Sequence, residues 1–174
     1  FIYTAQHPEA LKAIVGERAV EMKIKSVLGN YTQNLFVKKG VNTVLDENKF
    51  AAYQALLRRL KVEDADHYRL TVLISNAEKQ GEYADYVKYI KEYIATPGLD
   101  ASDMTLANWA KPFSAPGADE TAKAEMIEVL RNRVAEIEAG KRQGQNRVGN
   151  MKLSRPTDEL LRMIIQTMET GNVP

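Results

Sequence analysis

Four tyrosines within one short stretch have the type and spacing of a binding surface: Tyr83, Tyr86, Tyr89 and Tyr93. Steps of three and four residues place these rings along one side of a helix. Such a stripe, or the single tryptophan Trp109 acting as an anchor, can hold an extended peptide or a partner helix. Aromatic rings at helical spacing also pack between helices. We favour packing, with Tyr89 and Tyr93 covering the seam, and the partner-binding hypothesis stays open.

A basic stretch over residues 141–155 is the second candidate for binding. It has no acidic residue to balance its five cations, Lys141, Arg142, Arg147, Lys152 and Arg155. Clustered cations bind the phosphates of nucleic acids and other anionic ligands. The stretch lacks the interleaved aromatic rings on which bases stack, so we expect no nucleic-acid partner and favour a solvated loop. Lys141, Arg142 and Arg147 are kept as candidate partner contacts, with binding of an anion or a nucleic acid through the stretch as the weaker alternative.

The sequence has none of the residue arrangements that are typical of catalysis. It contains no His-Glu-x-x-His motif, no Gly-rich phosphate loop before Lys-Ser/Thr and no Gly-x-Ser-x-Gly motif. The absence of cysteine excludes disulfides, thiol catalysis and thiolate metal sites within this chain. The two histidines, His7 and His67, stand far apart and have no companion at metal-ligand spacing. We therefore predict a protein that is not an enzyme and that carries no metal and no cofactor.

The composition bounds the class of protein. Of 174 residues, 44% are hydrophobic and 27% are charged, which is the balance of an ordinary globular protein. The formal net charge of +1 gives no global field that would attract nucleic acid or an anionic membrane. No run of 18 apolar residues is present, so we expect no membrane insertion. The chain begins Phe1-Ile2-Tyr3, which we interpret as the start of a piece of a longer protein.

The residues from Asp64 to Pro97 predict two amphipathic helices joined at Gly81. In the first helix, apolar residues recur at three- and four-residue spacing, and Asp64 and Asp66 lie where carboxylates favour a helix start. Gly81 suits the left-handed residue that ends a helix, and Pro97 cannot continue the second one. A turn this short predicts that the two helices lie antiparallel.

The same pattern restarts at an offset of 36 residues. Ile90 corresponds to Met126, and Ile94 corresponds to Leu130, with all four expected on inward faces. A period of this size is typical of helical repeat proteins. We predict an all-α fold of antiparallel helical hairpins, stacked as a short superhelix similar to tetratricopeptide repeats.

The remaining segments complete a single predicted domain over residues 1–174. Helices are expected from Pro8 towards Leu28, from Asp46 to Leu60 and from Asp119 to about Ala139. A short helix is expected from Tyr31 to Lys39, with Leu35 and Phe36 inward. The predicted parts of the domain are hairpin units at 46–97 and 100–139, an irregular segment at 140–155 and a last helix at 156–170. No segment alternates long enough to predict a strand, so we expect helices only.

The segment Gly81–Ile94 resembles the second helix of a tetratricopeptide repeat, with its Gly-Glu-Tyr start and the closing Pro97. Taken whole, the order of elements is similar to the helical region that follows a thioredoxin-like domain in secreted or periplasmic proteins of the Bacteroidetes. The residues that carry this likeness are Pro8–Leu28, the Gly81 hairpin and Thr105–Ala110. The resemblance implies a periplasmic or secreted location. It implies no redox activity, because the redox cysteine pair of that family is absent.

These observations favour a protein–protein interaction or scaffolding module that belongs to a longer thioredoxin-like protein. The alternative is a purely structural domain that stabilises a neighbouring enzyme. The partner is expected to be a protein or a peptide. The sequence also allows a homodimer, in which a second copy of the chain covers the apolar last helix, Leu160 to Met168.

Overall fold

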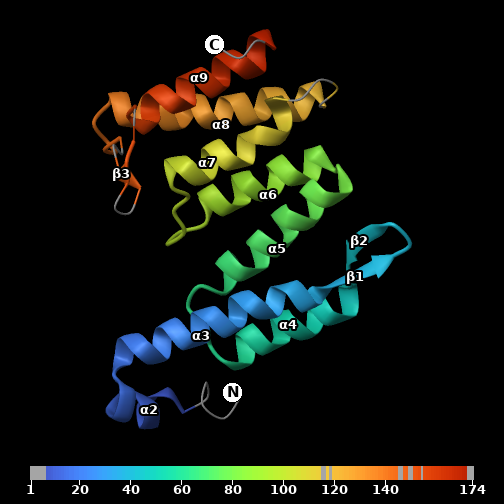
Figure 1. Ribbon diagram of the computed structural model, residues 1–174, viewed down its shortest axis with the longest axis vertical. Helices are drawn as coiled ribbons and strands as arrows, with labels where there is room; N and C mark the ends of the chain where they lie inside the picture. Colours follow the sequence, from blue (N-terminus) through green and yellow to red (C-terminus); the bar gives the residue numbers. More distant parts are fainter. Residues whose placement is uncertain are drawn as a thin grey trace. The chain divides into compact units, whose positions relative to one another are not determined.

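The computed structural model describes residues 7–114, 117, 119–144, 147–148, 151–153 and 155–171. The chain is mainly α-helical, which confirms the predicted fold class (Figure 1). It divides into two compact parts, Phe1–Gln80 and Gly81–Pro174, called unit 1 and unit 2 below. The boundary falls at the turn of the predicted Asp64–Pro97 hairpin, so its two helices belong to different units.

The helices of unit 1 start and end largely where the sequence predicts. Its elements are α2 (Pro8–Val15), α3 (Glu17–Tyr31), a 3₁₀ helix (Thr32–Leu35), β1 (Phe36–Lys39), β2 (Asn42–Leu45), α4 (Glu47–Arg59) and α5 (Ala65–Gln80). The predicted helix from Pro8 to Leu28 is divided at Gly16, whose φ of +88° favours glycine. Asp46 caps α4 by accepting a hydrogen bond from the Lys49 amide at 3.0 Å, as its position before the helix indicates.

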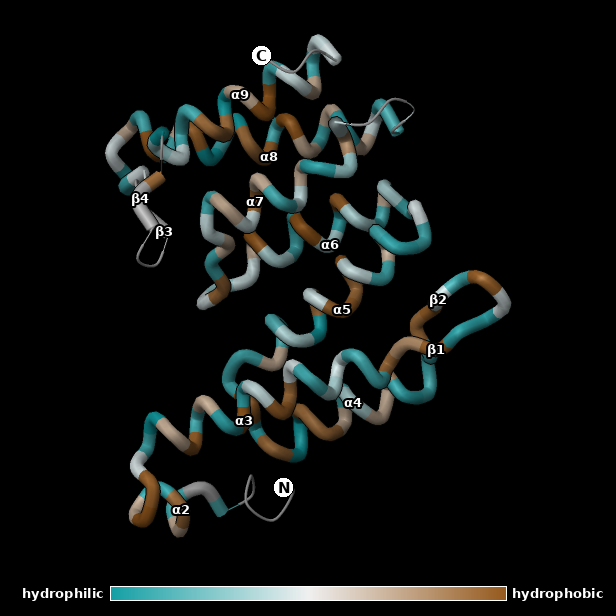
Figure 2. Tube along the Cα trace, in the orientation of Figure 1, coloured by the Kyte–Doolittle hydropathy of each residue, from teal (hydrophilic) through white to brown (hydrophobic). Residues whose placement is uncertain are grey.

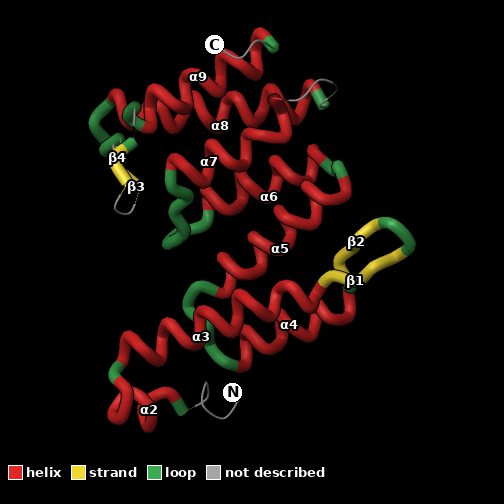
Figure 3. Tube along the Cα trace, viewed as in Figure 1, coloured by secondary structure: helices red, strands yellow, loops and turns green. Residues whose placement is uncertain are grey.

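The prediction of a helix over Tyr31–Lys39 is wrong, and so is the expectation of helices only. A short 3₁₀ helix is followed there by the antiparallel pair β1–β2, drawn in yellow in Figure 3. Phe36 lies opposite Leu45 in this pair. Gly40 and Val41 form the two-residue turn, and the φ of +64° at Gly40 suits a hairpin turn. Tertiary contacts hold the hairpin on α5: Asn76 accepts from the Leu45 amide at 3.2 Å, and Gln80 donates to the Thr43 carbonyl at 2.8 Å.

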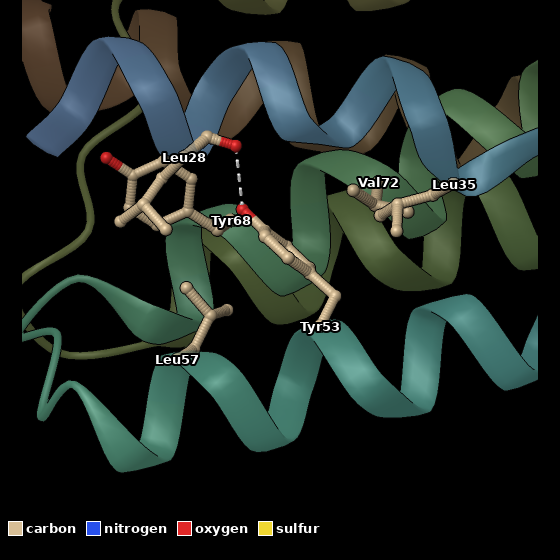
Figure 4. Close-up of a cluster of buried hydrophobic side chains, with 6 residues drawn as sticks. All are labelled: Leu28, Leu35, Tyr53, Leu57, Tyr68 and Val72. Atoms are coloured by element: carbon tan, nitrogen blue, oxygen red, sulfur yellow. Dashed lines mark hydrogen bonds between the residues drawn. The ribbon is translucent and has the colours of Figure 1, made fainter. Parts of the chain in front are cut away.

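The core of unit 1 is a cluster of six buried side chains from α3, α4, α5 and the 3₁₀ helix: Leu28, Leu35, Tyr53, Leu57, Tyr68 and Val72 (Figure 4). Hydrophobic positions, drawn in brown, recur along α3 and α4 in Figure 2, as expected for amphipathic helices. The Tyr53 hydroxyl donates to the Leu28 carbonyl at 3.1 Å, near the end of α3, where helix carbonyls lack partners within the helix. The cluster therefore joins apolar packing to one buried neutral hydrogen bond.

Unit 2 is built around its longest helix. Its elements are α6 (Tyr83–Ala95), α7 (Asp103–Ala110), a 3₁₀ helix (Lys111–Ser114), α8 (Glu120–Glu138), β3 (Arg147–Val148), β4 (Met151–Lys152) and α9 (Thr157–Thr170). Helix α8 packs against α6, α7 and α9. Its start confirms the predicted one, because Asp119 accepts from the amides of Thr121 and Ala122. Within the predicted irregular segment 140–155, β3 and β4 form a small antiparallel pair that the sequence analysis missed.

Candidate functional site

The predicted tyrosine stripe lies on α6, and most of its rings pack within unit 2. Tyr86 and Tyr93 are buried, whereas Tyr83 is half-buried. The rings of Tyr83 and Tyr86 lie 5.5 and 6.0 Å from that of Phe113, and Tyr93 meets Trp109 edge-on at 5.3 Å. Pairs at these distances stabilise a core beyond the area that they bury. The arrangement is the packed one that the sequence favoured, except that Tyr93 is buried instead of covering the seam.

Tyr89 and Trp109 are the other aromatic candidates, and both are half-buried. The Lys88 ammonium lies 5.1 Å from the centre of the Tyr89 ring, within the range of a cation–π contact. The Trp109 carbonyl accepts a hydrogen bond from the buried Tyr86 hydroxyl at 3.0 Å. This bond links α6 to α7.

The basic stretch is partly neutralised by acidic residues of unit 2. Arg142 donates two hydrogen bonds of 2.8 Å to the Asp100 carboxylate and lies 3.6 Å from Glu136. Hydrogen bonding from Arg142 lowers the pKa of Asp100 below its usual value. Lys141 is exposed, and Arg147 lies in β3 with its side chain outside the described residues. Arg142, predicted as a contact for an external partner, is thus paired with acidic residues of unit 2.

A buried ion pair that the sequence analysis missed connects α7, α8 and α9. Arg133 on α8 is 5% exposed and donates to Asp103 at 2.9 Å and to the Ala101 carbonyl at 2.8 Å. Asp103, 3% exposed, also accepts from the Thr157 hydroxyl at 2.6 Å. A signal for this network existed, because Arg133 falls on the apolar side of α8, three residues after Leu130. An arginine at such a position indicates a buried carboxylate partner.

Next to this network, α6, α7 and α8 enclose a groove of about 310 Å³, called the unit 2 groove below. Its apolar surface comes from Ile94, Ala95, Leu106 and Val129, and its polar rim from Lys91, Asn132, Arg133 and Glu136. Leu106 is fully buried at the bottom, whereas Ile94 is 37% exposed. An apolar bottom beneath a polar rim is the usual form of a recognition site.

The charges of this rim already have partners within unit 2. Lys91 lies 3.1 Å from Glu125, Arg133 is paired with Asp103, and Glu136 lies 3.5 Å from Arg133. The buried pair with Asp103 holds Arg133 in one geometry, whereas Lys91 and Glu136 remain about half exposed. A partner therefore has to supply an apolar side chain for the groove and a polar group for the exposed Asn132.

The groove lies beside a pair of residues, 36 positions apart in the sequence, whose burial differs. Ile90 on α6 and its counterpart Met126 on α8 are both fully buried. Ile94 and its counterpart Leu130 differ, since Leu130 is fully buried in a helix that packs against both α6 and α9. The expectation that Ile94 is inward is therefore wrong, and its exposed side chain borders the unit 2 groove.

Other site classes have less support in the described parts of the chain. No group of three or more His, Cys, Asp or Glu residues there is arranged to hold a metal ion. No helix among those residues has the length and apolar character that a membrane span requires. Compared with known protein families, curated proteins and solved structures, the chain gave no match in any of the three comparisons.

Proposed function

We propose that this protein is a non-enzymatic helical module that binds a protein or peptide partner through the unit 2 groove. The observation that carries the proposal is the 37% exposure of Ile94 beside the buried Leu106 in a groove with a polar rim. A partner segment would place an aliphatic side chain between Ile94 and Val129 and a polar group next to Asn132. Recognition by one apolar anchor within a polar rim is the common pattern of protein interfaces.

The sequence resemblance supports a wider proposal, in which the module belongs to a longer thioredoxin-like protein outside the cytoplasm. In that protein the module would position a partner and would carry out no redox chemistry. Tyr89 and Trp109, the other half-buried aromatic candidates on α6 and α7, are not among the residues that line the groove and are not part of the proposed surface.

The test selects peptides from a displayed random library against the whole chain and then measures their affinities by calorimetry. Ile94→Glu places a charge in the groove and should weaken binding of the selected peptides by about tenfold or more, as expected when an anchor site is lost. Ala84→Glu is the matched control, because Ala84 is exposed on the same helix and is not among the groove residues. Equal affinities for the parent chain and Ile94→Glu would refute the proposal, provided that both circular dichroism spectra are the same.

A second candidate function is a structural domain that stabilises a neighbouring domain. It is favoured by the apolar residues Ile14, Val15 and Met22 of α2 and α3, which are 79%, 54% and 62% exposed. A covering domain would remove this surface from water. Deleting residues 1–174 from the longer protein should then lower the unfolding temperature of the neighbour, whereas a pure interaction module would leave it unchanged.

A further inference from the structure

A second groove, of about 380 Å³, lies within unit 1 between α3 and the connection from α4 to α5. It is called the unit 1 groove below. Its apolar lining comes from Val20, Ile24, Leu28, Leu60, Val62 and Tyr68. Val20, Leu28 and Tyr68 are buried, whereas the charged residues around them, among them Glu21, Lys25 and Lys61, are exposed. The groove thus has a buried apolar floor and an open charged rim.

The groove floor includes one polar group of interest for binding, the hydroxyl of Tyr68. Tyr68 is 7% exposed, yet its hydroxyl makes no hydrogen bond to any described residue. The neighbouring Tyr53 differs, because its hydroxyl is bonded to the Leu28 carbonyl (Figure 4). No fully enclosed polar side-chain atom among the described residues lacks a partner, so the Tyr68 hydroxyl keeps access to the groove. The hydroxyl therefore lies at the groove without an acceptor from a described residue, and a ligand in the groove can supply one.

Burial also keeps this hydroxyl in the form that can donate a hydrogen bond. Desolvation raises the pKa of Tyr68 above its ordinary value, so the phenol carries its proton at neutral pH. The complementary group on a ligand is therefore an acceptor, such as a carbonyl oxygen. Around it the floor offers only apolar contacts, which suit an aliphatic side chain.

The rim carries charges of both signs. Lys12 lies 3.2 and 3.1 Å from Glu9 and Glu17, and Lys25 lies 3.8 Å from Asp64. Glu21, Glu63 and Lys61 have no ion pair with another described residue. A rim of mixed sign repels a polyanion as much as it attracts it, and it matches the mixed polar groups of a polypeptide.

We propose that the unit 1 groove binds a segment of a partner polypeptide, with an aliphatic side chain on the floor formed by Val20, Leu28 and Leu60 and a main-chain carbonyl bonded to the Tyr68 hydroxyl. This binding site is separate from the unit 2 groove and does not depend on it. The volume of the groove suits one side chain with its peptide group. The two grooves together would give the module two independent contacts with a partner.

The smallest probe with the required groups is N-acetyl-leucinamide, which has one aliphatic side chain and two amide carbonyls. Titrated into the whole chain, it should shift the methyl NMR signals of Val20, Leu28, Leu60 and Val62 in a saturable way. A ligand of this size is expected to bind with about millimolar affinity. The signals of Val129 and Ile94 in unit 2 report separately on the other groove.

Two matched tyrosine variants test the role of the hydroxyl. Tyr68→Phe should weaken probe binding about two- to tenfold, the value of one hydrogen bond, and should leave the unfolding temperature unchanged. Tyr53→Phe removes the structural hydrogen bond of the same cluster, so it should lower the unfolding temperature and leave binding unchanged. Equal affinity for the parent chain and Tyr68→Phe, or no saturable shift in the unit 1 methyl signals, would overturn the proposal.

A charged probe distinguishes the proposed polypeptide ligand from a small anionic ligand. N-acetyl-leucine carries a free carboxylate, and an internal polypeptide segment does not, so the proposal predicts that it binds no more tightly than the amide. The proposal would be overturned in favour of a small anionic ligand if N-acetyl-leucine bound more tightly than the amide and this difference disappeared in Lys61→Met. The Ile94→Glu variant should bind both probes in the unit 1 groove like the parent chain, so failure here is distinct from failure of the unit 2 proposal.

Discussion

Unit 1 and unit 2 satisfy their buried polar groups in different ways. In unit 1, the core hydrogen bond joins two neutral groups, the Tyr53 hydroxyl and the Leu28 carbonyl. In unit 2, the core contains the ion pair Arg133–Asp103, and Thr157 donates to the same carboxylate. A neutral hydrogen bond contributes about 1 kcal/mol net, whereas breaking a buried ion pair on one side costs several times more. Unit 2 should therefore be the part whose stability depends on single charged residues.

The largest expected effect follows from Asp103→Ala in unit 2. The change leaves Arg133 buried without its main carboxylate partner, and we expect the free energy of unfolding to fall by about 3–5 kcal/mol. Urea unfolding followed by circular dichroism measures the loss. Hydrogen exchange should show the amides of α7 and α9 opening faster, with those of unit 1 unchanged.

Asp66→Ala is the control for this experiment. Asp66 pairs with Arg69 at 3.1 Å on the surface of unit 1, where an ion pair contributes less than about 1 kcal/mol. If Asp103→Ala destabilised the protein no more than this control, the ion pair would not distinguish the two units.

The ends of α4 and α8 allow a second comparison between the units. In α8, Gly140 donates to the Ile137 carbonyl and Lys141 to that of Glu136, each at 3.0 Å. In α4, Lys61 and Val62 make the same pair of bonds to Arg58 and Leu57, at 3.0 and 3.2 Å. This pattern requires a left-handed residue after the helix, and the φ values are +68° at Gly140 and +50° at Lys61. Unit 1 thus places a lysine where unit 2 has the glycine that the geometry favours.

Exchanging these residues gives a medium-sized expected effect. Lys61→Gly should raise the free energy of unfolding by about 0.5–1 kcal/mol, because it removes the side chain from a left-handed position. Gly140→Lys should lower it by a similar amount, since nothing lies near the new Cβ atom and backbone strain alone acts. Thermal unfolding of both variants measures the two changes. Effects of the same sign would show that the cap geometry does not govern these positions.

The sequence was sufficient for the elements that are defined by local signals. The apolar periodicity, with starts expected at Asp46 and Asp119, predicted α4 and α8 to within a few residues. The β1–β2 hairpin was missed because its strands are short and because contacts with Asn76 and Gln80, more than 30 residues away, hold it in place. Sequence periodicity contains no information about such distant partners.

The candidate sites were predicted less completely for a related reason. The tyrosine stripe was located correctly on one helix, but its burial depends on Phe113 and Trp109 of the following segment. The unit 2 groove depends on the difference between Ile94 and Leu130, two residues that the 36-residue repetition treats as equivalent. Which of two equivalent apolar residues is covered depends on the neighbouring helices, and their packing is a tertiary property.

The smallest expected effect concerns the pH dependence of unit 2. Hydrogen bonding from Arg142 lowers the pKa of Asp100 in the folded protein below the value near 3.8 expected for the unfolded chain. The contribution of this pair to stability is therefore fully present above about pH 4 and is lost as the pH falls through the lowered pKa. Because the Asp100 side chain is 61% exposed, we expect less than about 1 kcal/mol. Urea unfolding at neutral pH and at about pH 3 should show a loss for the parent chain that is smaller in Asp100→Asn. An equal loss in both proteins would place the acid sensitivity of unit 2 elsewhere.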